Sequence, residues 1–188
     1  PFIKTAQELK TKPSQHSVKE LQSMGIQPDI LLCRTEVPLP LEARQKLALF
    51  CNIKPECVIE ASDVDTIYRV PLAYLKEGLD TQVCKHFGLE SKTPDLSIWE
   101  DIVQRATHPK DDVSIAVVGK YTGLQDAYKS IAESFQHAGI SNELKVNITW
   151  LNAEDLTDEK TTANILKDYH GILVPGGHGE RGTDGKMR

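Results

Sequence analysis

The fold class follows from the stretch Val113-Ser114-Ile115-Ala116-Val117-Val118, an apolar-rich run that a turn at Gly119 ends. Such a run is typical of a strand that is buried in a parallel sheet. Apolar residues then recur at helical spacing from Ala127 to Ala138, which predicts a helix that Gly139 ends. Three further elements are predicted: a strand at Val146–Leu151, a helix at Thr162–Lys167 and a strand at Gly171–Val174. This alternation predicts a doubly wound α/β fold with parallel strands.

The first half of the chain shows the same alternation. It predicts a helix at Ser17–Met24 that Gly25 ends, a strand at Ile30–Cys33, a helix at Leu41–Cys51, a strand at Cys57–Ile59, and a helical region at Tyr68–Phe87 with breaks at Pro71 and Gly78. Residues 88–111 differ, because prolines flank one helical stretch, Leu96–Ala106. We interpret them as a linker, and therefore expect two α/β domains. The second has too few predicted strands for a complete domain.

Composition excludes several classes of protein. The chain has 188 residues, 39% hydrophobic and 26% charged, and lacks the run of about 20 apolar residues that a membrane helix needs. The net charge is −5, and residues 1–89 are neutral with 11 basic and 11 acidic residues. Without a basic stripe, general nucleic-acid binding is not expected. The four cysteines form no C-x-x-C and the histidines show no metal-ligand spacing, so we expect free, buried thiols, no metal site and a cytoplasmic protein.

The first candidate motif is Lys10-Thr11-Lys12-Pro13-Ser14-Gln15-His16, which lies just before a predicted helix. Lysine ammonium groups and the free amides of a helix N-terminus together suit a phosphate chain. An ordinary solvated basic turn explains the same residues, and the residues alone favour that simpler interpretation.

Two further motifs follow predicted strands. Gly177, Gly179 and Gly182 satisfy G-x-G-x-x-G, but the fingerprint needs a helix next and an acid about 20 residues later, before which the chain ends. The same loop could aim amides at an oxyanion or be a plain surface turn. The second motif, Ser62-Asp63-Val64-Asp65, could bind a metal or a ribose, although capping of the next helix is the simpler explanation.

Taken together, these motifs have the order found in one family. The stretch from Glu8 to Val18 closely resembles the ELKTKPTQHSV signature of CTP synthases. Further resemblances follow in order along essentially the whole chain: Gly25–Ile30, Ala48–Asn52, Asp63–Tyr68, Val118–Tyr121, Asp126–Ser130 and Leu173–Gly177. No single block is decisive, but so many in one order are specific.

The resemblance implies a fold, a division into domains and a reaction. Residues 1–89 would be the C-terminal part of a P-loop-type, dethiobiotin-synthetase-like amidoligase domain. Residues 90–111 would be the linker, and residues 112–188 the start of a flavodoxin-like class I glutamine amidotransferase domain. In the family, ATP phosphorylates the 4-oxygen of UTP, and ammonia from glutamine then displaces the phosphate. The resemblance also implies Mg2+, GTP activation, inhibition by CTP and a homotetramer, and it is compatible with filaments.

Site residues follow from the same resemblance. Those that match UTP- or CTP-binding positions are Lys10, Thr11, Lys12, Pro13, Ser14, Gln15 and Lys46. Ser62, Asp63 and Val64 match contacts of the ATP adenine, and Gly177 matches a glycine of the oxyanion hole that contacts glutamine. Lys129 and Arg181 fall near regions implicated in GTP activation.

The chain departs from the family at two positions. Ser14 replaces the usual threonine and keeps its hydroxyl, whereas His178 replaces a phenylalanine and adds polarity that would affect glutamine binding. The phosphate-binding loop, the Mg2+ ligands and the glutaminase triad are expected outside residues 1–188, so the chain alone is expected to be inactive. Alternatives are another class I amidotransferase, a nucleotide-binding relative without chemistry, and a dinucleotide-binding oxidoreductase.

Overall fold

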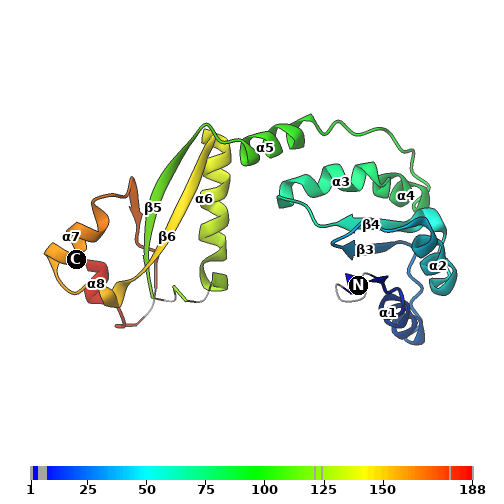
Figure 1. The fold of residues 1–188 in the computed structure, drawn as a ribbon, viewed down its shortest axis with the longest axis horizontal. Coiled ribbons are helices and arrows are strands. Elements are labelled where there is room, and N and C mark those ends of the chain that lie inside the picture. Colours follow the sequence, from blue (N-terminus) through cyan, green and yellow to red (C-terminus); the bar gives the residue numbers. More distant parts are fainter. Residues whose placement is uncertain (1, 4–7, 121, 124, 178, 188) are drawn as a thin grey trace. The chain divides into compact units, whose positions relative to one another are not determined.

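The computed structural model describes residues 2–3, 8–120, 122–123, 125–177 and 179–187. It divides into two compact units, Pro1–Val103 and Gln104–Arg188. Both units combine helices with parallel strands (Figure 1), which confirms the predicted α/β class.

The first unit is built on two parallel strands, β3 (Leu31–Thr35) and β4 (Val58–Ser62). A short antiparallel pair, β1 (Phe2–Ile3) and β2 (Glu8–Leu9), precedes them. The helices are α1 (Lys12–Ser23), α2 (Leu41–Cys51), α3 (Val70–Lys76) and α4 (Leu79–His86), with short 3-10 helices at η1 (Pro55–Cys57) and η2 (Ile67–Arg69). Figure 1 shows α1 and α2 on one side of β3 and β4, and α3 and α4 on the other.

The core of the first unit lies between the sheet and α1 and α2. Val18 of α1, Leu47 and Cys51 of α2, and Val58 of β4 are all buried in one apolar cluster. All four cysteines are free, as expected, but only Cys51 is buried, and the other three are half-buried. The predicted helix at Leu41–Cys51 is confirmed, because its apolar residues have this cluster to face.

Two helix boundaries in the first unit differ from the sequence-based expectation. Helix α1 begins at Lys12, not Ser17, because Pro13 occupies its first turn, where the missing N–H group costs nothing. Pro71 likewise lies in the first turn of α3 and does not break a helix, whereas Gly78 separates α3 from α4 at φ +74°. The basic motif is therefore part of the first turn of α1.

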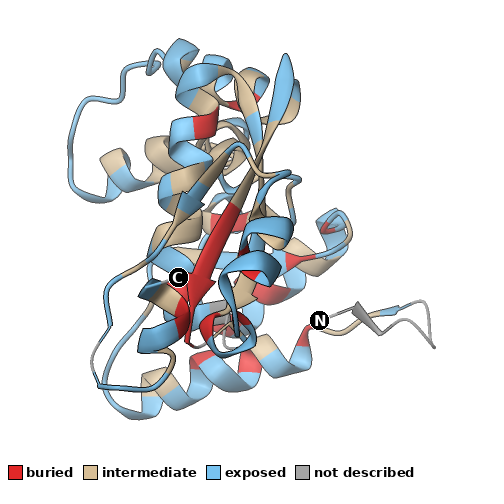
Figure 2. Cartoon of the chain, turned by 90° about the vertical axis from the view of Figure 1, so that its left-hand side faces the viewer, coloured by how far each residue is buried: buried red, intermediate tan, exposed pale blue. Residues whose placement is uncertain are grey.

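In its described residues, the second unit has a sheet of three parallel strands in the order β6-β5-β7. They are β5 (Asp111–Gly119), β6 (Leu144–Asn152) and β7 (Gly171–Leu173). The end of β5 is buried at the centre of this sheet (Figure 2), as a continuous apolar strand requires. The helices are α5 (Ser97–Thr107), at the boundary between the units, α6 (Lys129–Asn142), α7 (Glu159–Leu166) and α8 (Thr183–Met187), with η3 (Gln125–Tyr128) and η4 (Ala153–Asp155).

Helix α6 does not end at Gly139 as the sequence pattern predicted. The helix continues to Asn142, and Glu143 takes the left-handed conformation that ends it. Gly139 is buried, and a Cβ atom there would lie 2.6 Å from the Leu144 carbonyl oxygen. Glycine is therefore needed for the close approach of α6 to β6 and not as a helix stop.

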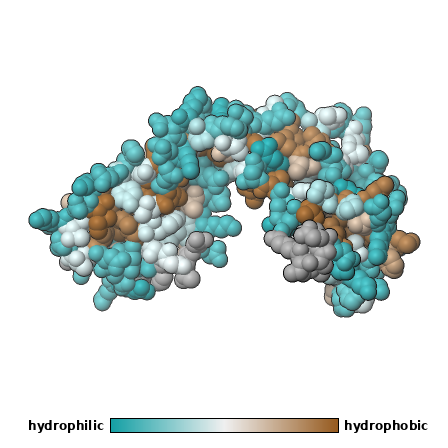
Figure 3. Space-filling view, in the orientation of Figure 1, coloured by the Kyte–Doolittle hydropathy of each residue, from teal (hydrophilic) through white to brown (hydrophobic). Residues whose placement is uncertain are grey.

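On the face seen in Figure 3, most exposed residues are hydrophilic, and apolar residues are exposed between them. Leu49, Met24 and Ile98 are among the most exposed apolar residues of the described chain. In the described part of the chain, no helix combines the length and apolar character needed to cross a membrane.

Candidate functional site

The basic motif forms the junction between β2 and α1. Thr11 and Gln15 are buried, and the Gln15 side-chain amide donates to the Thr11 hydroxyl at 3.1 Å. Lys12 and Pro13 are exposed, while the Lys10 ammonium is paired with Glu8. Lys10, Thr11 and Ser14 line a cavity of about 100 Å³ that reaches β3. The motif therefore has a fixed part, Thr11 and Gln15, and an accessible part.

The electrostatics of this junction favour an anion. The N-terminal end of a helix carries a partial positive charge, which acidic residues normally offset. The first turn of α1 contains no acidic residue, but contains Lys12 and follows Lys10. Positive charge at this end of a helix is unfavourable, and a bound anion would offset it. Lys46 is exposed on α2, which packs against α1.

The second group of predicted residues lies where β4 ends. Ser62, Asp63 and Val64 all line one cavity of about 610 Å³. The remaining lining residues are Leu32, Arg34, Ala61, Ile67, Val70, Ala73 and Tyr74. The carboxyl ends of parallel strands are the usual place for a ligand in α/β proteins, and an apolar lining suits a flat base.

The two acidic residues have different contacts, and Asp65 lies just before η2, where its carboxylate accepts from the Thr66 N–H at 2.9 Å. The Asp63 carboxylate pairs with Arg34 at 3.1 Å, and Asp65 pairs with Arg69 within 2.9 Å. No side-chain cap is found at the start of η2 in the described structure. Arg69 lowers the pKa of Asp65 through their hydrogen bonds. Asp63 therefore stays at the cavity, held by an exposed ion pair.

The glycine-rich loop follows β7 and is held by two lysines. The Lys120 ammonium donates to the Gly179 carbonyl at 2.7 Å, and the Lys186 ammonium donates to the Pro175 carbonyl at 2.8 Å. Lys120 is 6% exposed, so a nearly buried cation from the end of β5 reaches this loop. Both lysines also come close to Gly177, within 4.0 Å of where its Cβ would be. The two hydrogen bonds hold the backbone at Pro175 and at Gly179, on either side of Gly177.

Of the two residues predicted near a GTP-related region, one lies on a helix and the other in the turn before α8. Lys129 is the exposed first residue of α6. The Arg181 guanidinium forms two hydrogen bonds to Glu154, at 2.9 and 3.0 Å, which lowers the pKa of that carboxyl. His178, where the family has phenylalanine, lies outside the described residues.

The sequence pattern did not indicate the charged residues that lie next to the cavity at the end of β4 and next to the glycine-rich loop. Arg44, Glu60 and Glu77 form a partly buried network beside β4, and Lys120 and Lys186 hold the glycine-rich loop. Their partners lie 11 to 59 positions away along the chain, so no local pattern signals them.

Burial raises the pKa of Cys33 to about 11, which disfavours its reactive thiolate form.

Two family models match the chain. Residues 1–89 match the model described as the CTP synthase N-terminus, and residues 123–188 match that of class I glutamine amidotransferases. Curated relatives named CTP synthase match over the whole chain. They include the proteins of Rhodospirillum centenum at 58% identity, Methylobacterium radiotolerans at 57% and Methylorubrum extorquens at 55%. The chain spans 35% of the length of each of these relatives.

Proposed function

The chain belongs to the CTP synthase family, and we propose that it is a segment of an enzyme that aminates UTP to CTP. ATP would activate UTP, and ammonia released from glutamine would be the nitrogen donor. The class I amidotransferase match over residues 123–188 includes the glycine-rich loop. That match favours an oxyanion-binding role for the loop over a dinucleotide fingerprint.

One observation carries the proposal for the first unit. The cavity beside the basic motif and the cavity at the end of β4 share two lining residues, Leu32 and Arg34 of β3. The segments proposed for UTP and for ATP are therefore neighbours across a single strand. Phosphoryl transfer requires that the ATP γ-phosphate reach the UTP 4-oxygen, and neighbouring segments for the two nucleotides are consistent with this requirement. The resemblance implies that the UTP site lies at the interface of the tetramer, so the segment Lys10–Gln15 would serve a neighbouring subunit.

The proposed chemistry begins with binding of the UTP phosphates at the N-terminus of α1. The segment from Lys10 to Gln15 would supply this site together with Lys46, and CTP would compete for it as an inhibitor. Ser62, Asp63 and Val64 would contact the adenine of ATP. Phosphorylation of the UTP 4-oxygen by ATP turns a poor leaving group into a good one, and ammonia then displaces phosphate at C4.

Magnesium would accompany ATP in this reaction. The described residues contain no group of three His, Cys, Asp or Glu side chains that could hold a metal ion. They do not fit a complete Mg2+ site, and we propose that the ligands of the ion lie elsewhere in the complete protein.

In the second unit, we propose that Gly177 contacts glutamine and contributes its backbone amide to the oxyanion hole. An amide aimed at the developing negative charge stabilises the transition state of acyl transfer. All four cysteines lie in the first unit, so residues 104–188 contain no thiol nucleophile. We therefore propose that the chain alone is inactive. Lys129 and Arg181 would belong to a region that responds to GTP.

The wider organisation is also part of the proposal. Residues 1–89 would complete a P-loop-type, dethiobiotin-synthetase-like amidoligase domain, and residues 112–188 would begin a flavodoxin-like amidotransferase domain, with 90–111 as linker. The enzyme would be a cytoplasmic homotetramer that binds UTP, CTP, ATP, glutamine and GTP but no nucleic acid or membrane.

The test is CTP formation by the complete protein that contains these 188 residues. UTP, ATP and Mg2+ are supplied with either ammonia or glutamine, and wild type is compared with Lys12→Ala. We expect CTP from both nitrogen donors, and a rate at low UTP that is about tenfold lower in the variant, because a charge-assisted phosphate contact is lost. Lys19→Ala, an exposed change on the same helix, is the matched control.

The outcomes separate the parts of the proposal. Absence of CTP from either donor in the wild type would exclude the enzyme. CTP from ammonia but not from glutamine would leave the first unit's role intact and point to a defective glutaminase half, where His178 is the first residue to replace. An unchanged Lys12→Ala variant would remove Lys12 from the nucleotide site.

A further inference from the structure

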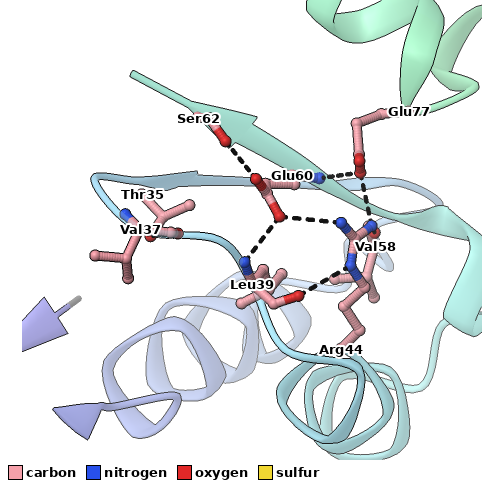
Figure 4. Close-up of polar contacts among 8 residues, drawn as sticks. All are labelled: Thr35, Val37, Leu39, Arg44, Val58, Glu60, Ser62 and Glu77. Atoms are coloured by element: carbon pink, nitrogen blue, oxygen red, sulfur yellow. Dashed lines mark hydrogen bonds and ion pairs between the residues drawn. The ribbon is translucent and has the colours of Figure 1, made fainter. Parts of the chain in front are cut away.

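A charged network lies along the side of β4 that faces away from β3. The Arg44 guanidinium on α2 binds two carboxylates: Nη2 donates to Glu60 at 3.1 Å and Nη1 donates to Glu77 at 2.6 Å. Figure 4 shows the three side chains converging from α2, from β4 and from the residue that follows α3. Three separate elements are therefore joined at one point.

The network also satisfies the backbone of β4. Arg44 Nη1 donates to the Val58 carbonyl at 3.1 Å, and the Glu60 N–H donates to the Glu77 carboxylate at 2.9 Å. In the described residues, β4 pairs with β3 only, so these two backbone groups face away from the sheet. The two side chains take the hydrogen-bonding place of a neighbouring strand, which holds this part of β4 in a fixed path.

Burial makes these interactions stronger than those of a surface ion pair. The side chains of Arg44, Glu60 and Glu77 are 23%, 15% and 23% exposed. The hydrogen bond from Arg44 is the largest cause of the lowered pKa of Glu77, and it raises the pKa of Arg44. Removal of one member leaves a partly buried charge without its partner, which is costly.

Glu60 connects the network to the proposed ATP site. One of its oxygens accepts from the Ser62 hydroxyl, and the other accepts from the Leu39 N–H at 2.8 Å (Figure 4). Ser62 is the last residue of β4 and the first of the three residues proposed to contact adenine. Its hydroxyl is therefore committed to Glu60, and the path of residues 62–64 depends on where Glu60 is held.

We propose that Arg44, Glu60 and Glu77 are positioning residues for the ATP-binding segment Ser62–Val64. This inference rests on the proposed function. None of the three side chains is among the described residues that line the cavity, so they act through β4. Loss of the network would let the end of β4 move and would weaken ATP binding. Arg44 and Glu60 also hydrogen-bond the backbone of Leu39, which lines the cavity beside the basic motif. Thr11 and Gln15 of that motif keep their own contact, however, so UTP binding is affected less.

The test uses the complete enzyme and three variants. Arg44→Met removes the guanidinium group but keeps the aliphatic part of the side chain. Arg44→Lys keeps the positive charge without the paired donors of the guanidinium, and Glu77→Gln removes one negative charge. Glu42→Gln, at an exposed position on the same helix, is the matched control for charge. CTP formation is measured with ammonia as donor, so that KM for ATP and KM for UTP are obtained separately. ATP binding by calorimetry and glutamine hydrolysis are measured on the same preparations.

The expected result is selective for ATP. KM for ATP and the calorimetric Kd rise about tenfold in Arg44→Met, since hydrogen bonds to charged groups are lost. Both constants also rise in Glu77→Gln, and Arg44→Lys lies between Arg44→Met and wild type. KM for UTP rises less than KM for ATP, because the network also holds Leu39 beside the basic motif. Glutamine hydrolysis and the control variant stay at wild-type values.

Two results would overturn the inference. If KM for ATP is unchanged while the melting temperature falls, the network serves stability alone. If KM for ATP and KM for UTP rise by the same factor, the network holds the whole unit and not the ATP segment. A wild-type enzyme that makes no CTP would instead overturn the proposed function and, with it, this inference.

Discussion

At the scale of single residues, the end of β5 depends on one missing side chain. A Cβ atom at Gly119 would lie 2.6 Å from the Tyr128 hydroxyl. That hydroxyl accepts a hydrogen bond from the Lys120 N–H at 3.0 Å, and the Tyr128 ring stacks on Trp150 at 5.3 Å between centroids. Gly119 therefore allows tyrosine to close the turn after the central strand.

Gly119→Ala is expected to destabilise the second unit by about 1–3 kcal/mol, the usual cost of overpacking. Urea unfolding followed by Trp150 fluorescence measures this, in a Trp99→Phe background that leaves one tryptophan. Gly123→Ala is the control, because a Cβ atom there would meet nothing within 4 Å. Equal midpoints for the two variants would show that Tyr128 moves aside without cost.

Glycines also show what the sequence could and could not predict at this scale. Gly25 was predicted to end a helix, and it follows the end of α1 with φ +83°. Gly139 carries the same signal but lies inside α6, where a neighbouring strand requires the absence of a side chain. The local sequence can signal the end of a helix at Gly25. It cannot signal the close packing at Gly139, because that contact is with residues of β6 that approach only in the folded chain.

At the scale of elements, periodicity predicted all of the longer helices and the five strands β3 to β7, because each has one apolar face or run. It missed α8, whose five residues are too few to show a period. Because α8 begins directly after Gly182, the expectation that the chain ends before a helix follows the glycine pattern was wrong. Some of the predicted nucleotide-binding residues line a common cavity, but only with their neighbours in the sequence: Lys10, Thr11 and Ser14 line one cavity, and Ser62, Asp63 and Val64 line another. Contacts between elements, such as Lys120 with Gly179, could not be predicted because 59 positions separate the partners.

Lys120 leads to a prediction about the glycine-rich loop. Lys120→Met in the complete enzyme is expected to lower the glutamine-dependent rate by about ten- to a hundredfold, because the loop proposed to carry the oxyanion-hole amide loses one of its hydrogen bonds. The ammonia-dependent rate is expected to remain at the wild-type value, since it bypasses the loop. CTP formation with each nitrogen donor measures both.

The control for this prediction is Lys145→Met, at an exposed position on β6. Arginine at position 120 keeps a cation and donors, so Lys120→Arg is expected to recover part of the glutamine-dependent rate. An equal loss with glutamine and with ammonia would contradict the prediction and would show that Lys120 supports the fold in general.

At the scale of the whole molecule, the sequence predicted two domains because residues 88–111 lack the alternation of strand and helix that surrounds them. The structure separates two compact units within this region, at Val103 and Gln104. Residues 89–94 are exposed and have no regular secondary structure, whereas α5 follows at Ser97. Exposed segments of this kind are preferred sites of proteolysis, because a protease must bind its substrate as an extended chain.

Brief trypsin treatment of the 188-residue chain is therefore expected to make its first internal cut after Lys92, which is exposed in that segment. Lys76 and Lys85 are protected by their helices, and Lys54 precedes a proline, which trypsin does not cleave. Mass spectrometry should find the fragments 1–92 and 93–188 early. Lys92→Gln should delay this cut, and a first cut after Lys110 would still fall in the proposed linker. Early cuts spread through residues 12–89 would instead show that the first unit does not hold together on its own, because a compact unit protects its internal lysines and arginines until it opens.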